Sequence, residues 1–293
     1  ALDFYDHKTV NSLFNQSVSP LASAGYTTVL GNAAKVRNRG FEIELDADII
    51  RKKDLTLSVG INGTHYRTTL LSVPADQIPN YDETMDLPKG CWTVATEDMA
   101  QAGTASHAGR GIFYLRGEGK DLFNLYMPKY AGVDEKSGLP LYWHRVTYYD
   151  VNMNETTGVY EHGGRYANYK VGDNVKTDVA ADASYYEVGS ATPDWIGGLT
   201  LSLKWKDFDF SVVSAYQIGG KFFSMEYSQH LFRGSSMGRQ RIPVSKDLVG
   251  NTWNPDNTSA YYPMQWFPSS GASSYYLDGS LLPSAHNYTD KSL

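Results

Sequence analysis

Cysteine, charge and long apolar runs are all scarce in this chain, and each shortage excludes a class of protein. The single cysteine, Cys91, excludes an intrachain disulfide and a zinc site built from several cysteines, so we expect it to pack as a small apolar residue. Charged residues make up 20% of the sequence, below the roughly 25% of an ordinary soluble domain. With a net charge of −6 and no cluster of lysine and arginine, the chain lacks a surface for nucleic-acid phosphates.

The sequence contains no window of about 18 consecutive apolar residues, which excludes a transmembrane helix. Membrane-spanning strands are not excluded, because each of them alternates lipid-facing and lumen-facing residues over only about 10 positions. The sequence begins at Ala1 without the basic region and apolar core of a signal peptide. We therefore expect either a processed protein or an internal segment of a longer one.

Aromatic residues and glycine, in contrast, are plentiful. The 293 residues include 22 Tyr, 11 Phe, 6 Trp and 27 Gly, and 41% of the chain is hydrophobic. This is enough apolar material for one large domain or two small ones. The mixture favours an all-β chain with many turns.

Two β-hairpins are evident from alternation with a period of two. The run from Phe41 to Ile49 alternates apolar residues with Glu42, Glu44, Asp46 and Asp48, and after a charged break at 51–54 a second alternating run continues from Leu55. The same design recurs at 199–205 and 208–216, with Lys206 and Asp207 in the turn. A short strand near Leu2 and Phe4 brings the expected number to about five.

Long connections separate these strands. The region 67–191 is rich in Gly, Tyr, Asp and Asn, and a further stretch follows from 224 to 293. Loops of this length are uncommon in compact domains, but transmembrane barrels combine short turns on one side with long excursions on the other. Five strands cannot close a barrel, so we expect neighbouring strands that this sequence does not contain and a natural chain that continues beyond it.

Several motifs resemble those of the SusC-like, RagA-like TonB-dependent transporters and follow one another in the order found in that family. They are the runs VRNRGFEIEL at 36–45, KYAGVD at 129–134 with GLPLY at 138–142, GSATPDWIGG at 189–198, WKDFDFSV at 205–212 and YQIGGK at 216–221. The signature residues that carry the resemblance are Asn38, Gly40, Glu42, Gly132, Asp134, Thr192, Pro193, Asp194, Gly219 and Gly220. One departure is Asp207, where the family usually has a glycine, and Asp tolerates left-handed turn geometry better than most residues.

The resemblance implies that residues 1–293 are the C-terminal portion of a 22-stranded transmembrane antiparallel β-barrel in the outer membrane of a Gram-negative bacterium. It implies that 67–191 is a long extracellular loop region, and that the family's internal plug domain is absent from this chain. It further implies energy from a TonB complex, a SusD-like surface lipoprotein as partner, and import of oligosaccharides or peptides. The alternative from the residues themselves is a secreted all-β glycan-binding module.

In a barrel the cost of a lipid-facing charge, about 2–4 kcal/mol near the midplane, fixes the orientation of the first hairpin. Glu42, Glu44, Asp46 and Asp48 are expected to face the lumen, while Phe41, Ile43, Leu45, Ala47 and Ile49 face lipid. We also expect Trp195, Trp205 and Tyr216, near the strand ends, to lie at the membrane interfaces. A strand of a soluble sandwich explains the alternation equally well.

The sequence offers no catalytic constellation, and we expect the chain not to be an enzyme. Ser236 lies in a G-x-S-x-G match but lacks the preceding strand and following helix that a nucleophile elbow needs. The seven histidines are scattered and show no paired metal-binding spacing, so each is expected to be a surface or lumen residue. No cofactor is expected apart from calcium.

Calcium is the one metal that the sequence suggests. The oxygen ligands Asp150, Asn152, Asn154 and Glu161 stand at positions 1, 3, 5 and 12 of a loop like that of an EF-hand. Position 6 is Glu155 where the sharp turn requires glycine, so a solvated polar turn is the competing interpretation.

Five aromatic residues in the long loop are candidates for substrate binding by stacking on sugar rings or peptide side chains: Trp92, Tyr142, Trp143, Tyr148 and Tyr149. The competing interpretation is that the loop packs its aromatic residues against itself.

Overall fold

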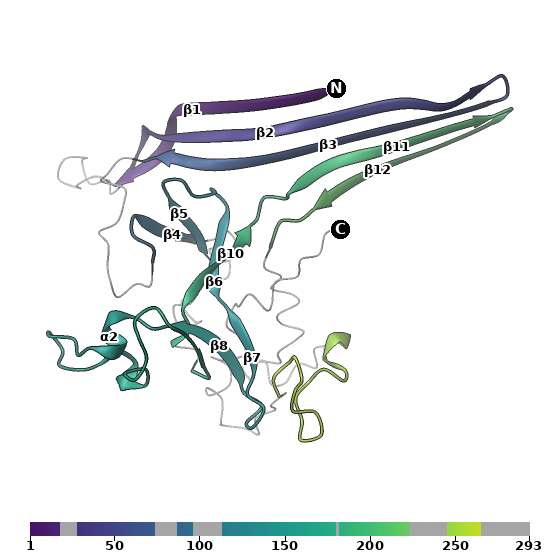
Figure 1. The fold of residues 1–293 in the computed structure, drawn as a ribbon. Helices are drawn as coiled ribbons and strands as arrows, with labels where there is room; N and C mark the ends of the chain where they lie inside the picture. Colours follow the sequence, from purple (N-terminus) through teal and green to yellow (C-terminus); the bar gives the residue numbers. More distant parts are fainter. Residues whose placement is uncertain (18–27, 74–86, 96–112, 180–181, 223–244, 265–293) are drawn as a thin grey trace.

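The computed structural model describes residues 1–17, 28–73, 87–95, 113–179, 182–222 and 245–264. Figure 1 shows a long five-stranded sheet with two smaller sheets and a short helix gathered on one side of it. All strand pairings in these residues are antiparallel apart from one isolated parallel bridge, which confirms the all-β expectation. No helix in the described part of the chain is long and apolar enough to cross a membrane.

The large sheet contains the five strands that the sequence predicts. They are β1 (Leu2–Ser17), β2 (Thr28–Lys52), β3 (Leu55–Ser72), β11 (Trp195–Trp205) and β12 (Phe208–Ile218), in the order β1-β2-β3-β11-β12. The first three strands are longer than the alternating runs indicate, because their outer ends are polar and keep pairing where the apolar pattern has stopped.

The two tight turns lie together at one end of the sheet (Figure 1). The β2–β3 turn and the β11–β12 turn are linked by a hydrogen bond of 2.9 Å that the amide of Lys206 donates to the carbonyl oxygen of Asp54. Lys206 is the left-handed residue of its turn, with φ at 53°, so the expectation that Asp207 takes this conformation is wrong. The long connections leave from the opposite end of the sheet.

Strand register places the four acidic residues of β2 on one face. Glu42 lies opposite Thr64 and Asp46 opposite Gly60, and Asp48 accepts a 2.6 Å hydrogen bond from the hydroxyl of Ser58. Ile43 and Leu45 point to the other face, as the period of two requires. The alternation does not reach Ile49, because a register shift between Asp48 and Ile50 puts Ile50 opposite Leu57.

The connection between β3 and β11, residues 73–194, is called the excursion below. It folds into two sheets of short strands: β10 (Tyr185–Ser190), β6 (Asn124–Pro128), β5 (Phe113–Gly117) and β4 (Cys91–Ala95) form one, and β7 (Tyr130–Val133), β8 (Pro140–Arg145) and β9 (Asn174–Thr177) form the other. It also contains α2 (Tyr148–Val151) and the 3-10 turn η3 (Glu161–Gly164), while η6 (Lys246–Leu248) follows β12. The expected loop from 67 is thus too early by several residues, because β3 continues to Ser72, and it is folded rather than irregular.

The apolar core of the described chain lies mainly in the excursion. Leu115 and Met127 are completely buried, and all five residues of β6 are buried. A second cluster attaches the excursion to the large sheet, where Leu70 of β3 packs with Trp92 and Ala34. Leu70 also exchanges backbone hydrogen bonds with Gly119 and Lys120, of 2.8 and 3.0 Å. Leu70 lies opposite Val36, so the excursion covers the same face of the sheet as the acidic residues.

Glycines let a tyrosine lie flat across three strands. Tyr216 of β12 crosses Gly197 of β11 to reach β3, where its hydroxyl donates a 2.8 Å hydrogen bond to the carbonyl oxygen of Asn62 beside Gly63. A Cβ on Gly197 would collide with this carbonyl oxygen and with the phenol ring. The small residue is therefore needed for the close approach of the three strands.

Gly197→Ala is expected to lower the free energy of unfolding by about 1–3 kcal/mol, because the added methyl group overpacks the contact between Tyr216 and Asn62. The melting temperature, followed by circular dichroism of the β-sheet, measures the loss. The neighbouring Gly198→Ala is the control, since its Cβ would make one tight contact of 3.3 Å with the carbonyl oxygen of Ser214 rather than a collision. Equal melting temperatures for the two variants would contradict this account.

Candidate functional site

The face of the large sheet opposite the acidic residues carries apolar side chains that are exposed or partly exposed. Leu45 is 59% exposed, and by register the same face carries a continuous group that we call the apolar belt: Leu2, Ile43, Leu45, Val59, Ile61, Leu199, Leu201, Leu203, Phe210 and Val212. An apolar surface that extends over five strands is unusual on a soluble protein and indicates contact with another apolar phase.

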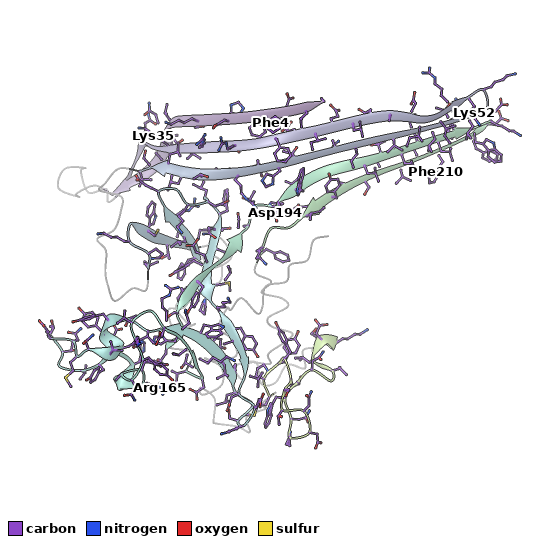
Figure 2. All side chains as sticks on the ribbon, in the orientation of Figure 1. Phe4, Lys35, Lys52, Arg165, Asp194 and Phe210 are labelled. Carbon is purple, nitrogen blue, oxygen red and sulfur yellow. The ribbon has the colours of Figure 1, made fainter. Side chains whose placement is uncertain are left out.

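Aromatic rings border the apolar belt on both sides. Near the long-connection end, Phe41 contacts Phe4 and Trp195 with ring centroids 5.8 and 5.2 Å apart, and Trp195 lies 5.7 Å from the ring of His65. Near the tight turns, Trp205 stacks on Phe208 at 6.2 Å. Figure 2 shows Phe4 and Phe210 between the sheet ends that Lys35 and Lys52 mark.

Charged residues take over on this face beyond the first aromatic border. Arg37 forms an ion pair with Asp6, and Arg39 lies 3.8 Å from the same carboxylate. Arg67 on β3 occupies the corresponding position opposite Arg39. The face thus changes from charged to aromatic to apolar and back to aromatic along the strands.

The spacing of the two aromatic borders matches the thickness of a membrane. β11 has 11 residues and begins and ends with a tryptophan, so Trp195 and Trp205 are about 33 Å apart at about 3.3 Å per residue. Strands of outer-membrane barrels are tilted by about 40°, which reduces this distance to a height of about 25 Å. The apolar band of such barrels has the same height.

Five of the signature residues meet at one junction between the sheet and the excursion. The guanidinium of Arg67 pairs with the Asp194 carboxylate and donates to the carbonyl oxygens of Thr192 and Pro193, at 2.9 and 3.3 Å. The amide of Asp194 donates to Ile218 at 2.9 Å. Gly219 and Gly220, both at positive φ, lie so close to Asp194 and Pro193 that a Cβ on either would crowd them. These residues hold the start of β11 against the ends of β3 and β12.

The other signature residues also have structural positions. Gly40 lies beneath the ring of Tyr5 on the face that carries Asn38 and Glu42. Gly132 adopts a φ of 106°, and Asp134 begins the β7–β8 turn by accepting a 2.9 Å hydrogen bond from the amide of Ser137. The structure places none of these side chains in a common binding site with the junction.

The five aromatic candidates for substrate binding do not form one surface. Trp92 and Tyr142 are buried in separate clusters, so the expectation that their rings are available to a ligand is wrong. Trp143 lies beneath the ammonium group of Lys176 at 5.8 Å. Tyr148, which is 57% exposed, contacts Tyr149 edge to face. Only these last three rings stay candidates for substrate binding. The sequence did not separate the two groups, because it does not show which aromatic side chains are buried.

The four calcium candidates are brought together only in part. Thr147 places its hydroxyl 2.9 Å from an oxygen of Asp150 and 2.7 Å from an oxygen of Glu161. The amide of Asn152 instead donates to the carbonyl oxygen of Tyr148 at 3.1 Å, and Asn154 accepts hydrogen bonds from two backbone amides of its own turn. A calcium ion bound by all four residues stays a prediction.

A buried polar cluster that the sequence does not reveal surrounds Asp150. His144 on β8 is almost completely buried, which corrects the expectation that every histidine is a surface or lumen residue. It stacks on Tyr166, with ring centroids 4.1 Å apart. The hydroxyl of Tyr166 lies 2.7 Å from Asp182, and His162 lies 3.0 Å from the same carboxylate. Side chains of residues that are up to 38 positions apart in the sequence thus contact one another in one cluster.

The titration of this cluster follows from its hydrogen bonds. The bond to Asp182 raises the pKa of His162 above its ordinary value, against the opposing effect of burial. Burial by itself would raise the pKa of Asp182, but hydrogen bonds from His162 and Tyr166 outweigh it and lower that pKa. Burial also raises the pKa of Tyr166. The carboxylates of the cluster therefore favour a positive charge beside them.

Arg67→Ala is expected to lower the free energy of unfolding by about 1–2 kcal/mol, because the backbone oxygens of Thr192 and Pro193 lose their charged donor along with Asp194. Asp194→Ala is expected to cost less than about 1 kcal/mol, since an ion pair this exposed is screened by water. Chemical denaturation measures both. Arg39→Ala, with only a long contact to Asp6, is the control, and a loss for Asp194→Ala equal to that for Arg67→Ala would contradict the assignment.

The sequence and the fold of the chain are similar to those of bacterial receptors and transporters. No family model matches the chain. The chain is 22% identical over 282 residues to TonB-dependent receptor P3 of Formosa agariphila, a match that covers 96% of this chain and 24% of that receptor. The chain therefore spans about a quarter of the length of this curated relative.

Solved structures with the same fold are those of RagAB. The chain matches the RagAB peptide transporter with a TM-score of 0.57 and 19% identity, covering 92% of this chain and 24% of that one. It matches the RagAB peptide importer in the closed-closed state with a TM-score of 0.59 and 18% identity, over 98% and 25% of the two chains. The antiparallel sheet with its folded excursion is thus the fold of a known transporter.

These relatives are receptors and transporters rather than enzymes, in agreement with the expected absence of catalysis. Ser236, in the G-x-S-x-G match, lies outside the described residues. The chain is thus similar in sequence, along 96% of its length, to a quarter of a TonB-dependent receptor, and similar in fold to a quarter of the RagAB transporter chain.

Proposed function

We propose that this chain forms barrel wall and outer connections of a TonB-dependent importer in the outer membrane of a Gram-negative bacterium. The observation that carries the proposal is the apolar belt with its two aromatic borders, whose height of about 25 Å fits the hydrocarbon thickness of such a membrane. In this position the exposed leucines of β11 contact lipid, and the sheet is continued by further strands of a barrel.

The two ends of the sheet give the orientation. Outer-membrane barrels have short turns on the periplasmic side and long connections outside. The turns at 53–54 and 206–207 therefore lie on the periplasmic side, and the excursion lies at the outer mouth. Beyond the aromatic border at Phe41 and His65, β2 continues over residues 28–40 and β3 over residues 66–72, and both support the excursion there.

The acidic face of the sheet is then the lumen side. Glu42, Glu44, Asp46 and Asp48 stay hydrated in a wide wet barrel, whereas on the lipid face each carboxylate would be destabilising, by less than the roughly 2–4 kcal/mol of a lysine or arginine at the midplane. The excursion on the same side narrows the space through which cargo enters. The cargo is a peptide or an oligosaccharide, and the RagAB structures, described as a peptide transporter and a peptide importer, favour a peptide.

The same assignment implies two partners. A SusD-like surface lipoprotein covers the outer mouth and contacts the excursion, and a TonB complex supplies energy through a part of the protein that lies outside this chain. The alternative from the sequence, a secreted glycan-binding module, is disfavoured because soluble proteins rarely expose an apolar surface of this extent.

Import is tested in cells that lack the gene of the complete protein. Uptake of fluorescent peptides and of fluorescent oligosaccharides is measured with and without the gene, and again after the proton gradient is abolished. We expect uptake of one of the two classes to require both the gene and the gradient. Uptake that depends on neither, together with recovery of the protein from the soluble fraction, would contradict the proposal.

A pair of adjacent substitutions tests the orientation of the wall. Leu201→Lys, near the middle of β11 on the apolar belt, is expected to cost about 2–4 kcal/mol, because the ammonium group must enter lipid. Ser202→Lys, one residue later on the acidic face, is expected to have little effect. The fraction of folded protein in the outer membrane, seen as heat-modifiable mobility in electrophoresis, measures both. Losses of similar size in the two variants would exclude a lipid-facing belt.

A further inference from the structure

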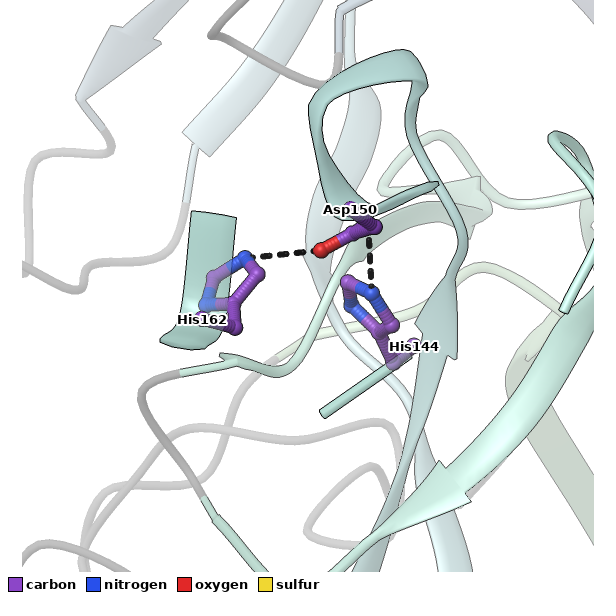
Figure 3. A group of neighbouring side chains, drawn as sticks. All are labelled: His144, Asp150 and His162. Carbon is purple, nitrogen blue, oxygen red and sulfur yellow. Dashed lines mark hydrogen bonds and ion pairs between the residues drawn. The ribbon is translucent and has the colours of Figure 1, made fainter. Parts of the chain in front are cut away.

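The structure assigns a second feature to the excursion: we propose that His144, Asp150 and His162 bind a divalent transition-metal ion of the zinc class. Their ligand atoms lie within 4.8 Å of one another. Figure 3 shows both imidazole rings turned toward the carboxylate of Asp150 from opposite sides. The inference concerns the excursion alone and does not depend on the transport proposal.

The distances between the ligand atoms are close to those around a single bound metal ion. Nε2 of His144 lies 2.9 Å from one oxygen of Asp150, and Nε2 of His162 lies 3.8 Å from the other. Ligands placed about 2.0–2.1 Å from a tetrahedral zinc are about 3.3 Å apart, which lies between these two values. Because the three ligand atoms all lie within 4.8 Å of one another, side-chain shifts on the order of an ångström are sufficient to form the site.

One carboxylate oxygen of Asp150 is buried without a hydrogen-bond partner among the described residues. The side chain is 0% exposed, and its Oδ2 already accepts from the amide of Thr147 at 2.7 Å and faces His144. Its Oδ1 has no hydrogen-bond partner among the described residues and points toward His162. A buried carboxylate oxygen without a partner costs free energy, and a bound cation removes that cost.

Outer contacts hold both imidazoles in the orientation that a metal requires. Nδ1 of His144 lies 2.6 Å from the carbonyl oxygen of Asp182, and Nδ1 of His162 lies 3.0 Å from the carboxylate of the same residue. With a metal ion bound, both Nδ1 atoms would carry the proton and donate to Asp182, and both Nε2 atoms, which face Asp150, would be free to bind the ion. A carboxylate or carbonyl behind each metal-binding histidine is the usual arrangement in zinc proteins.

The donor set decides the class of ion. Two imidazole nitrogens and one carboxylate oxygen suit zinc, nickel or cobalt, whereas calcium prefers a shell made of oxygen alone. The side chain of His162 is 28% exposed, so solvent reaches the cluster and a water molecule can complete four-coordination. The site shares Asp150 with the predicted calcium loop but uses nitrogen ligands that calcium does not favour.

The ion would act as a cross-link. It joins β8, the helical turn α2 and η3, and so closes the segment between His144 and His162 at the outer end of the excursion. In Figure 1 this region, marked by α2, lies on the side of the excursion away from the large sheet. A metal cross-link fixes loops that lack a large core of their own, because binding energy becomes folding energy.

The test is zinc binding by the complete protein that contains this chain, purified in detergent and stripped with a chelator. Zn²⁺ alone is titrated by calorimetry, and bound zinc per molecule is counted by mass spectrometry. We expect His162→Ala and Asp150→Asn each to bind one zinc fewer than the unchanged protein, because each removes a direct ligand of the ion. Cobalt in place of zinc should give a visible absorption band of four-coordinate type that His162→Ala removes.

His7→Ala is the matched control, since His7 is an exposed histidine of β1 far from the cluster, and it should leave the zinc count unchanged. His162 is partly exposed, so its replacement keeps the test valid even where Asp150→Asn disturbs folding. An equal zinc count in His162→Ala and the unchanged protein would overturn the proposal, as would the absence of zinc binding in the unchanged protein.

Discussion

In the hydrocarbon of a membrane no water is available to satisfy a backbone N–H or C=O group, and in the proposed position of this chain the rest of the structure depends on that constraint. It requires paired strands, and each strand must then present apolar side chains to lipid at every second position. β2, β3, β11 and β12 meet this requirement with leucine, isoleucine, valine and phenylalanine on one face. In the proposed barrel the other face is the wet lumen, where the acidic residues stay hydrated.

The same constraint divides the chain into two parts that are stabilised differently. The described part of the large sheet has few buried side chains, and its cohesion comes from its backbone pairing and its tyrosine and glycine contacts, to which lipid adds in the proposed position. The excursion, which the proposal places in water, has a core of its own around Leu115 and Met127. Arg67, which binds the backbone at 192–193 and the carboxylate of Asp194, connects the two parts at the end of the apolar belt.

The sequence predicts the large sheet well because the period of two is a direct consequence of one face contacting lipid. The two hairpins, their turns and the acidic face of β2 follow from that alternation alone. The bulge at Ile49 does not follow from the alternation, because a single unpaired residue in a strand leaves no recognisable pattern in the sequence. The left-handed turn residue is Lys206 rather than Asp207, since the hairpin geometry and not the residue type decided the position.

The excursion is much harder to predict from sequence. Its strands have four to six residues, too few to show a period, and its aromatic residues are buried or exposed according to contacts between distant segments. Trp92 is buried by Leu70 and Ala34, neither of which is near it in the chain. His144 and His162 meet because β8 and η3 fold onto Asp150, whereas their spacing of 18 residues matches no metal-binding motif.

The most direct test of the lipid-facing belt is a scan of spin labels along β11, from position 198 to 204, in the protein reconstituted in bilayers. Collisions with oxygen report exposure to lipid, and collisions with a water-soluble nickel complex report exposure to water. The account predicts a period of two, with oxygen access highest at Leu199, Leu201 and Leu203 and nickel access highest at the alternate positions. Uniform access to the nickel complex along the strand would contradict it.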